Sequence, residues 1–324
     1  MRAIQIHEFG DPAAIETYQI EDPAPPGKGQ VRVDVAGIGV GYFDGLLIRG
    51  DYQIKPDLPF IPGSSFAGTV ESVGEGVEHL KPGMPVAAFA LHGAMAEQIV
   101  LPAASCAPLP PEVDLRAAAN FFISWATSLY GLREIGAVQA GETVLVLGAA
   151  GSTGTSAIEC AKALGARVVA AASTEAKREH CRAHGADVTV DYTADDWRDQ
   201  VKAATDGKGV NAVYDPVGGE IAEPALRLLA PGGRYLVVGF VTGIAKIPLN
   251  LPLLKRCSIH GVNWGGSVIA DSSVVPPVIS TLVEWTAAGK IDPGPAQIYP
   301  LERAGEAFDA LFSRRSVGGI VVTP

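Results

Sequence analysis

Residues Thr143–Gly154 (TVLVLGAAGSTG) form an apolar run that ends in three glycines spaced three residues apart. Apolar residues then recur through residues 155–164 at the spacing of a helix, and Gly165 follows at a position typical of a helix end. The stretch therefore predicts a buried strand, a glycine turn and a helix. Glycine lets backbone N–H groups approach a ligand, and a helix N-terminus has unpaired donors, so such a turn suits a pyrophosphate. A flexible surface loop is the alternative, but the flanking strand and helix favour a dinucleotide.

Length and composition describe a globular protein of about two domains. The chain has 324 residues, 48% of them hydrophobic and 19% charged. A net charge of −10 argues against nucleic acid or an anionic membrane as a partner. No apolar run reaches the ~18 residues of a membrane span, and the N-terminus lacks the apolar core of a signal peptide. The four cysteines are scattered, so we expect reduced thiols and a cytoplasmic location.

The order of patterns predicts an α/β chain. Residues 1–120 alternate in short runs broken by Pro and Gly, which is typical of a partly open β-barrel, and two helices follow within residues 115–132. Six strands and four helices then alternate, which predicts a doubly wound parallel sheet. The expected strands are Thr143–Leu147, Arg167–Ala172, Asp187–Val190, Val210–Tyr214, Arg234–Val238 and Cys257–Val262; the helices are Thr155–Leu164, Glu175–His184, Trp197–Thr205 and Glu220–Leu229. A mixed tail is expected to return to the first domain, with a helix over Val278–Ala288, a strand over Gln297–Tyr299, a helix over Leu301–Phe312 and a strand over Gly319–Val322.

Many short motifs, in order along nearly the whole chain, are shared with one family. They are Ala36-Gly37, Phe43-Asp44, Arg49–Tyr52, Pro62–Val70, Val73-Gly74, Gly148–Gly154, Lys162–Ala166, Gly185–Asp187, Tyr214–Gly219, Val238–Phe240 and Gly261–Gly265. In these motifs the chain resembles the medium-chain dehydrogenase/reductase superfamily, in its zinc-independent quinone oxidoreductase branch. The resemblance implies a GroES-like β-barrel domain (1–120 and 267–324) and a Rossmann NADP-binding domain (121–266). It also implies a homodimer joined through an edge of the Rossmann sheet.

The positions that hold zinc in other members of the superfamily are altered. Zinc members carry a Gly-His-Glu motif where this chain has Gly63, Ser64 and Ser65, and a cysteine where it has residues 37–41. Zinc needs imidazole, thiolate or carboxylate ligands, and serine hydroxyls are poor ligands. The only nearby carboxylate is that of Asp44, which a turn or cap hydrogen bond explains equally well. We therefore expect no metal.

The end of the second strand bears on the choice of dinucleotide. NAD-preferring Rossmann domains place an acid there, whereas this strand ends in residues 170–174 without one, and Glu175 comes later. Lys177 and Arg178 follow, and a neutral pocket with nearby cations suits a 2′-phosphate. A solvated helix face is the alternative for these two cations. With similar proteins as a guide, we expect NADPH, with the 2′-phosphate bound by Ser173, Thr174, Lys177 and Tyr192.

The resemblance implies further cofactor contacts. Thr127 and Asn263 would lie near the nicotinamide, and Val217, Gly239 and Phe240 would lie at strand ends. Packing or turn formation is an alternative for each, although ligands of such sheets bind at the strand ends. The glycine turn would contribute Gly148, Ala150, Gly151, Ser152, Thr153 and Gly154.

The expected chemistry is hydride transfer, in which the cofactor carries the hydride and the protein positions it. Without a metal the acceptor must already be electrophilic, as quinones and α,β-unsaturated carbonyls are. Tyr52 matches a tyrosine that faces the nicotinamide in similar quinone reductases, and Tyr42 is a second candidate to donate a hydrogen bond. For Tyr52, packing under a loop is an equal alternative. Two positions depart from the family, with Gly41 in place of a common Asn and Gly319 in place of a usual Lys.

Three functions follow from these observations. The first is a metal-free, NADPH-dependent quinone or enone reductase. The second is an enoyl-thioester reductase, although a net charge of −10 does not suggest the basic entrance that a CoA substrate needs. The third is a non-catalytic NADPH-binding or redox-sensing protein, which the departure at Gly41 would suit.

Overall fold

The computed structural model describes residues 1–324 and divides into two compact units. Unit 1 comprises Met1–Ile123, Ile279–Ala287 and Asp292–Pro324, and unit 2 comprises Ser124–Val278 and Ala288–Ile291. The chain thus returns to unit 1 at residue 279, inside helix α10 (Val275–Ala287), rather than at residue 267. None of the helices is both long enough and apolar enough to cross a bilayer.

Unit 1 is built on a seven-stranded sheet. Its order is β14-β15-β3-β4-β5-β7, and β6 pairs with β3. The strands are β3 (Gln30–Gly39), β4 (Ser65–Val73), β5 (Pro85–Phe89), β6 (Gln98–Pro102), β7 (Cys106–Pro108), β14 (Gln297–Pro300) and β15 (Ile320–Thr323), and a separate pair is formed by β1 (Arg2–Ile4) and β2 (Thr17–Gln19). The register of β3 on β4 shifts twice, and such bulges bend a sheet. The tail strands therefore complete the sheet that the N-terminal strands begin.

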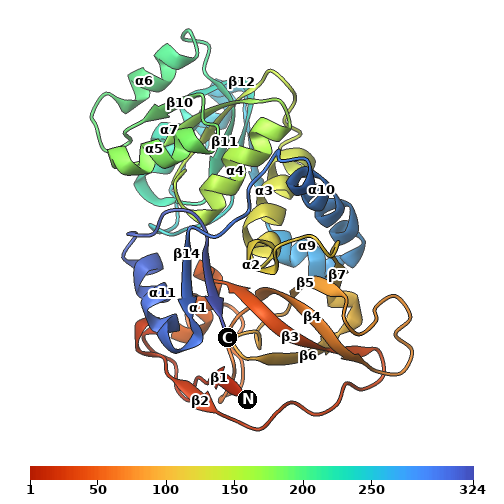
Figure 1. Cartoon of the computed structure of the whole chain (residues 1–324). Helices are drawn as coiled ribbons and strands as arrows, with labels where there is room; N and C mark the ends of the chain where they lie inside the picture. Colours follow the sequence, from red (N-terminus) through yellow and green to blue (C-terminus); the bar gives the residue numbers. More distant parts are fainter. The chain divides into compact units, whose positions relative to one another are not determined.

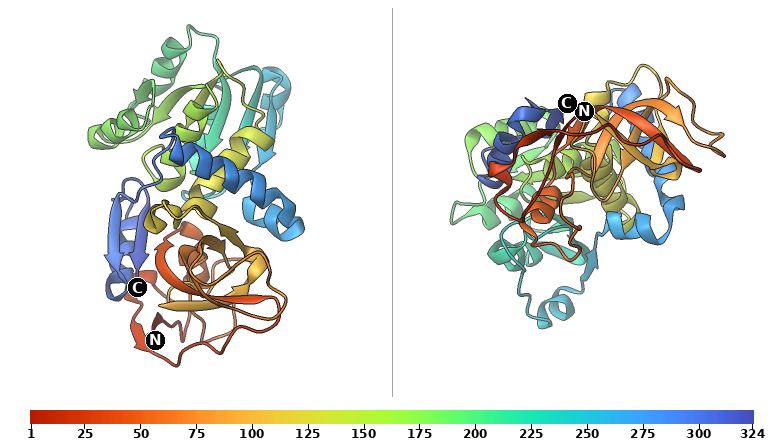
Figure 2. Two further views of the ribbon diagram at one scale, coloured as in Figure 1. Left: turned by 45° about the vertical axis from the view of Figure 1, so that its right-hand side comes forward. Right: turned by 90° about the horizontal axis from the view of Figure 1, so that it is seen from below.

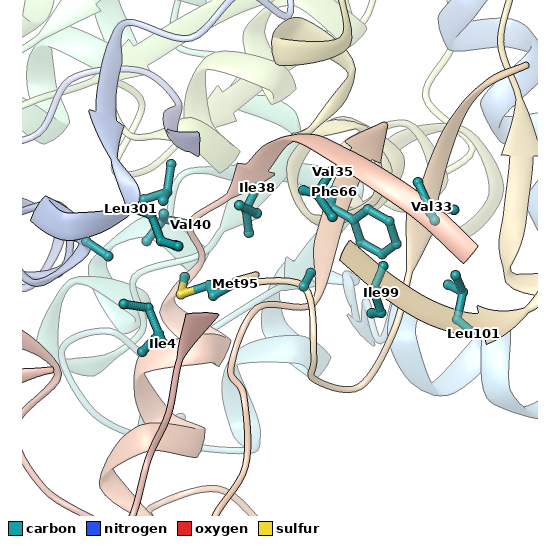
Figure 3. Close-up of a cluster of buried hydrophobic side chains, with 14 of the residues drawn as sticks. Ile4, Val33, Val35, Ile38, Val40, Phe66, Met95, Ile99, Leu101 and Leu301 are labelled. Atoms are coloured by element: carbon teal, nitrogen blue, oxygen red, sulfur yellow. The ribbon is translucent and has the colours of Figure 1, made fainter. Parts of the chain in front are cut away.

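The strands of this sheet contribute to one apolar core. The alternate residues Val33 and Val35 of β3 point into it, and so does Ile38, which lies beyond the second register shift, beside Phe66 and Ile99 (Figure 3). The flanking helices are α1 (Tyr42–Arg49), α2 (Leu115–Ala118) and α11 (Ala304–Phe312), with short 3₁₀ turns at Pro12–Ala14, Ala103–Ser105 and Leu301–Arg303. Helix α1 was not predicted, because its eight residues include Gly45 and give little helical signal.

Unit 2 is a doubly wound sheet of six parallel strands, as the sequence predicts (Figure 1). The strands are β8 (Thr143–Val146), β9 (Arg167–Ala171), β10 (Val188–Val190), β11 (Val210–Asp215), β12 (Leu229–Val237) and β13 (Ser258–Gly261), in the order β10-β9-β8-β11-β12-β13. The first strand, β8, lies between β9 and β11, so the order reverses at the carboxyl end of β8. Ligands of open α/β sheets bind at that point.

The helices of unit 2 connect its strands and pack beside them. They are α4 (Ser152–Ala163), α5 (Glu175–Ala183), α6 (Trp197–Ala204), α7 (Ala222–Leu226), α8 (Asn250–Lys255) and α9 (Trp264–Ala270), and α3 (Ala126–Leu129) is flanked by π-helical stretches at Phe121–Trp125 and Tyr130–Ile135. Short 3₁₀ turns stand at Gly219–Ile221 and Ser272–Val274. The expected helix over 220–229 is shorter, because Leu229 already opens β12. The segment from Trp264, which follows the last predicted strand, is helix α9, and the side chain of Asn263 caps it.

Candidate functional site

The glycine turn between β8 and α4 is packed too closely for side chains at two of its glycines. Gly148 has a φ of 55°, and a Cβ on it would lie 2.7 Å from Cγ2 of Val217. A Cβ on Gly154 would lie 2.4 Å from the carbonyl oxygen of Gly148. Gly151 differs, because its Cβ would meet nothing nearer than 3.6 Å. The backbone of α4 therefore packs directly against the turn at Gly154, whereas there is free space beside Gly151 that a ligand could occupy.

The N-terminus of α4 offers unused hydrogen-bond donors. No side chain caps the helix at Gly151, and the first turn holds no acidic residue. The hydroxyl of Ser152 instead shares a 2.6 Å hydrogen bond with that of Ser124. The first-turn N–H groups and the positive end of the helix dipole are thus left for an anion. This donor set, beside glycines at a strand end, fits a dinucleotide pyrophosphate.

Two loops at the strand ends are fastened to each other. The buried carboxylate of Asp215, at the end of β11, accepts hydrogen bonds from the N–H groups of Val217 (2.8 Å) and Gly218 (2.9 Å). Thr242, in the loop after β12, donates its N–H to the carbonyl of Val217 at 2.9 Å. Gly239 and Phe240 belong to this second loop, and the Phe240 side chain is 54% exposed. The structure therefore brings Val217, Gly239 and Phe240 together at one edge of the sheet.

A chain of buried hydroxyls lies behind the turn, and sequence reasoning missed it. The hydroxyl of Ser128 is 2.7 Å from that of Ser156 and 2.9 Å from that of Tyr214. Ser156 in turn donates to the carbonyl of Ser124 at 3.1 Å. The network ties the α3 region to α4 and β11, and it holds Thr127, which is half-buried, in its place on α3.

The end of β9 leads into a capped helix, α5, and a largely buried arginine lies beside it. Thr174 is the N-cap of α5 and accepts a hydrogen bond from the N–H of Lys177 at 3.3 Å. Arg178 is only 16% exposed, and its guanidinium lies 2.9 Å from both the Glu175 and the Asp191 carboxylates. Arg178 therefore fastens strand ends and does not offer its charge to a ligand. Ser173 and Tyr192 are partly exposed, and the Tyr192 ring packs against the core of unit 2.

A histidine pair links α4 to α5 away from the glycine turn. Nε2 of His180 lies 2.9 Å from the hydroxyl of Thr155, and Nδ1 of His184 lies 2.6 Å from a carboxylate oxygen of Glu159. The two imidazole rings are 4.2 Å apart. Burial, reinforced by the neighbouring His184, lowers the pKa of His180 to about 4. The pair therefore holds α5, which carries Lys177, against the helix of the glycine turn.

In unit 1, a buried carboxylate fixes the start of α1. Asp44 is fully buried; one of its oxygens accepts the N–H of Gly41 at 2.9 Å and the other accepts the hydroxyl of Ser64 at 2.7 Å. Burial raises the pKa of Asp44 to about 6, while the hydrogen bonds oppose this rise. Ser65 donates to the carbonyl of Ala119 at 2.6 Å. The side chains of Asp44, Ser64 and Ser65 are thus all engaged in hydrogen bonds within unit 1.

The two candidate catalytic tyrosines pack on different partners. The ring of Tyr42, at the start of α1, lies 4.6 Å from that of Phe312 in α11. The ring of Tyr52 lies edge-on to that of Phe43 at 4.7 Å. Both tyrosines are partly exposed, so each has a packed face and an accessible face. Either could present its hydroxyl to a ligand, and the assignment stays a prediction.

Two other positions singled out in the sequence, Asn263 and Gly41, take part in local contacts. Asn263 is exposed, and its side-chain oxygen accepts the N–H of Gly266 at 3.0 Å, which caps α9. Asn is a common N-cap residue, so Asn263 was the sequence signal for the start of α9. At Gly41, a Cβ would lie 3.0 Å from Cδ1 of Ile123, so the isoleucine fills the space beside this residue. A side chain at position 41 would have to displace Ile123.

The chain brings together no group of three or more His, Cys, Asp and Glu side chains that could hold a metal ion. Ser64 and Ser65 are engaged in hydrogen bonds, as described above. The chemistry of these donors does not suit zinc. Whether the protein works without zinc stays a prediction.

Two segments of the chain match known protein families. Residues 27–111 match the alcohol dehydrogenase GroES-like domain family, and residues 152–284 match the zinc-binding dehydrogenase family. Quinone oxidoreductase-like protein 2 of Rattus norvegicus is 37% identical over 309 residues, covering 95% of this chain and 88% of the relative. The chain belongs to the medium-chain dehydrogenase/reductase superfamily, in its quinone oxidoreductase branch.

Solved structures of medium-chain reductases bear on the cofactor. The Escherichia coli quinone oxidoreductase complexed with NADPH superposes with a TM-score of 0.93, at 29% identity and with 100% of both chains covered. A structure described as an NAD-dependent alcohol dehydrogenase superposes with a TM-score of 0.90, at 29% identity, with 100% of both chains covered. This medium-chain reductase is therefore an oxidoreductase that uses a nicotinamide cofactor, and the choice between the two cofactors depends on its own residues.

Proposed function

We propose that this chain is a metal-free, NADPH-dependent reductase that transfers a hydride to a quinone or an α,β-unsaturated carbonyl. The observation that carries the proposal is the uncapped N-terminus of α4 on a glycine turn, at the point where the strand order reverses. NADPH, when bound, supplies the hydride. The likeness to a quinone oxidoreductase complexed with NADPH supports both the cofactor and the class of acceptor.

The residues of each unit have distinct parts in this proposal. Ser152, Thr153 and Gly154 would hold the pyrophosphate with their N–H groups, and the strand-end loops would carry Val217, Gly239 and Phe240 against the cofactor. Tyr52 or Tyr42 would donate a hydrogen bond to the carbonyl oxygen of the acceptor. The anion formed by hydride addition is an enolate or phenolate, which is readily protonated, so no strong acid is needed.

The preference for NADPH rests on the end of β9. Residues 170–174 contain no acid that would bind a ribose 2′-hydroxyl, and Lys177 lies in the first turn of the next helix. Ser173, Thr174 and Tyr192 would complete the 2′-phosphate site. Glu175 is paired with Arg178 and Arg182, so its charge is balanced within α5.

We also propose a homodimer joined along β13, the last strand of the unit 2 sheet. One side of this strand has no neighbouring strand in the chain, and an unpaired edge is a template for pairing. The four free cysteines, three of them buried, suit the cytoplasm that we expect.

The test is oxidation of NADPH and NADH at 340 nm by protein dialysed against EDTA. The acceptors are 1,4-benzoquinone, 9,10-phenanthrenequinone and an alkenal, with crotonyl-CoA as the competing substrate. We expect turnover of the first three that survives EDTA and is faster with NADPH. Faster turnover of crotonyl-CoA would favour an enoyl-thioester reductase. Tight NADPH binding with no turnover would favour a binding protein.

A further inference from the structure

The loop after β12 and helix α8 carry large apolar side chains that the chain leaves uncovered. Four side chains are 71–84% exposed, and Ile259 on β13 is 40% exposed. We call them together the α8 patch, which comprises Ile244, Leu249, Leu253, Leu254 and Ile259. In the right-hand view of Figure 2, the helix near residue 250 protrudes from unit 2. On the surface of a monomeric protein, exposed apolar side chains of this size usually occur singly. A group of five within sixteen residues therefore marks an interaction surface.

The patch belongs to a folded segment. Leu251, on the inner side of α8, is only 4% exposed and lies in the core of unit 2. Ala245 and Ile247 alternate with the exposed positions and pack against the same core. The carbonyl of Arg256, after α8, accepts the N–H of Gly232 at 2.9 Å. The inner residues therefore fix the segment, and the outer residues are left for a partner.

A second copy of this chain is the occupant that the geometry suits. The patch includes Ile259 of β13, one of the two edge strands of the sheet, and an edge strand can pair with its own copy about a two-fold axis. A fully exposed leucine-sized side chain presents roughly 60–120 Å² of apolar surface that burial can remove. At their exposed fractions, the five side chains offer roughly 200–400 Å² per copy. A standard interface buries ~450 Å² of apolar surface per partner, so the patch supplies about half of it or more.

The patch is continuous with the cofactor loops. Ile244 directly follows Gly243, whose carbonyl accepts the N–H of Gly219 at 2.8 Å. Thr242 is bonded through its N–H and its hydroxyl to the carbonyl of Val217, at 2.9 and 3.1 Å. Between Gly243 and Pro248, no backbone hydrogen bond outside helices and strands holds the loop. The position of the strand-end loops therefore depends on how residues 244–249 are held.

We propose that a second copy seated on the α8 patch holds the loop over residues 240–249, so that dimerisation and NADPH binding stabilise each other. The inference rests on the proposed function, because it takes Val217, Gly239 and Phe240 as cofactor contacts. Linkage requires the coupling to be reciprocal. Each NADPH that binds tightens the dimer by the factor by which the dimer tightens that NADPH site, so two bound NADPH molecules tighten the dimer by the square of that factor.

The test uses the full chain with the pair of substitutions Leu253→Glu and Leu254→Glu, which place charges at the centre of the patch. A matched control is Ile269→Glu on α9, 72% exposed, and a second is Ile298→Glu on β14, 47% exposed. Light scattering coupled to size exclusion gives the oligomeric state, and NADPH fluorescence gives the Kd. We expect the double variant to be monomeric with a Kd raised at least ~5-fold, and both controls to match the wild type.

A dilution series of the unaltered protein supplies the reciprocal measurement and avoids any question of folding. Since each dimer binds two NADPH molecules, saturating NADPH should lower the concentration of half-dissociation by the square of the factor found for the Kd. A monomeric double variant with the wild-type Kd, or dissociation insensitive to NADPH, overturns this inference and leaves the proposed function standing. Wild-type protein that is monomeric when saturated with NADPH also overturns it. If the wild type does not bind NADPH, both the inference and the proposed function fail.

Discussion

Addition of one methyl group should lower the stability of the protein at one glycine of the turn and leave it unchanged at another. In Gly154→Ala, the new Cβ would lie 2.4 Å from the Gly148 carbonyl oxygen and 2.6 Å from Cα of Ala149. These atoms are backbone, so α4 must move by roughly 1 Å before the contacts become ordinary. Overpacking of this kind costs about 1–3 kcal/mol, which corresponds to about 2–12 °C in Tm for a unit of this size.

In Gly151→Ala, the new Cβ meets its nearest atom at 3.6 Å, and the backbone φ of −79° suits alanine. The chain should therefore keep its stability, or gain about 0.4–1 kcal/mol from the less flexible unfolded state. The methyl group nonetheless stands where we place the pyrophosphate. We expect the Kd for NADPH to rise about tenfold or more, which is about 1.4 kcal/mol.

The assay pairs thermal unfolding with NADPH fluorescence titration. Gly154→Ala should lose both stability and affinity, and Gly151→Ala should lose affinity alone. Gly10→Ala is the control, since a Cβ there meets nothing within 4 Å. Wild-type NADPH affinity in Gly151→Ala would refute the placement of the pyrophosphate. Wild-type Tm in Gly154→Ala would refute the packing argument.

Four other predictions test single contacts. Lys177→Ala should lower the preference for NADPH over NADH by about tenfold or more, because a hydrogen bond to a charged group contributes about 1.5–3 kcal/mol. Arg178→Ala, which removes a cation held by two carboxylates, should lower Tm and leave that preference unchanged in steady-state kinetics with both cofactors. Asp44→Asn should destabilise unit 1 by about 1–3 kcal/mol in thermal unfolding, because an amide donor would face groups that themselves donate; an unchanged Tm would contradict this. Burial lowers the pKa of His180 from 6.5 to about 4. Between these two pH values the folded chain binds fewer protons than the unfolded chain, so the protein loses stability as the pH falls from 6.5 to about 4. His180→Gln, which keeps a polar partner for Thr155, should flatten the fall in Tm between pH 6.5 and 4, whereas parallel curves would exclude His180 as its cause.

The parts of the fold that could be predicted from the sequence are those with a local pattern. The apolar run before Gly148 and the periodic helix after it predicted β8 and α4, and repetition of that alternation predicted the six-stranded sheet. The short helices α1, α8 and α9 show no such periodic pattern. Each contains Gly or Pro, which weakens the helical signal, and the start of α1 is fixed by the hydrogen bond from Ser64 to Asp44, which are 20 positions apart.

The candidate site, like the fold, could be predicted from the sequence only where the pattern is local. A glycine motif predicts a turn, because the backbone geometry is local. Whether a cation is available depends on carboxylates elsewhere in the chain, and Arg178 is neutralised partly by Asp191, thirteen positions away in the sequence. The hydroxyl chain through Ser128 and Tyr214 joins residues 86 positions apart, which no local pattern reveals.

The central claim is hydride transfer from NADPH without a metal. The most direct test incubates EDTA-dialysed protein with an alkenal and NADPH that carries deuterium at C4 of the nicotinamide, on the face that reacts. Elemental analysis of the same sample measures zinc. We predict one deuterium on the β-carbon of the saturated product, at less than one zinc per ten chains. Unlabelled product, or turnover that appears only when zinc is restored, would contradict the account.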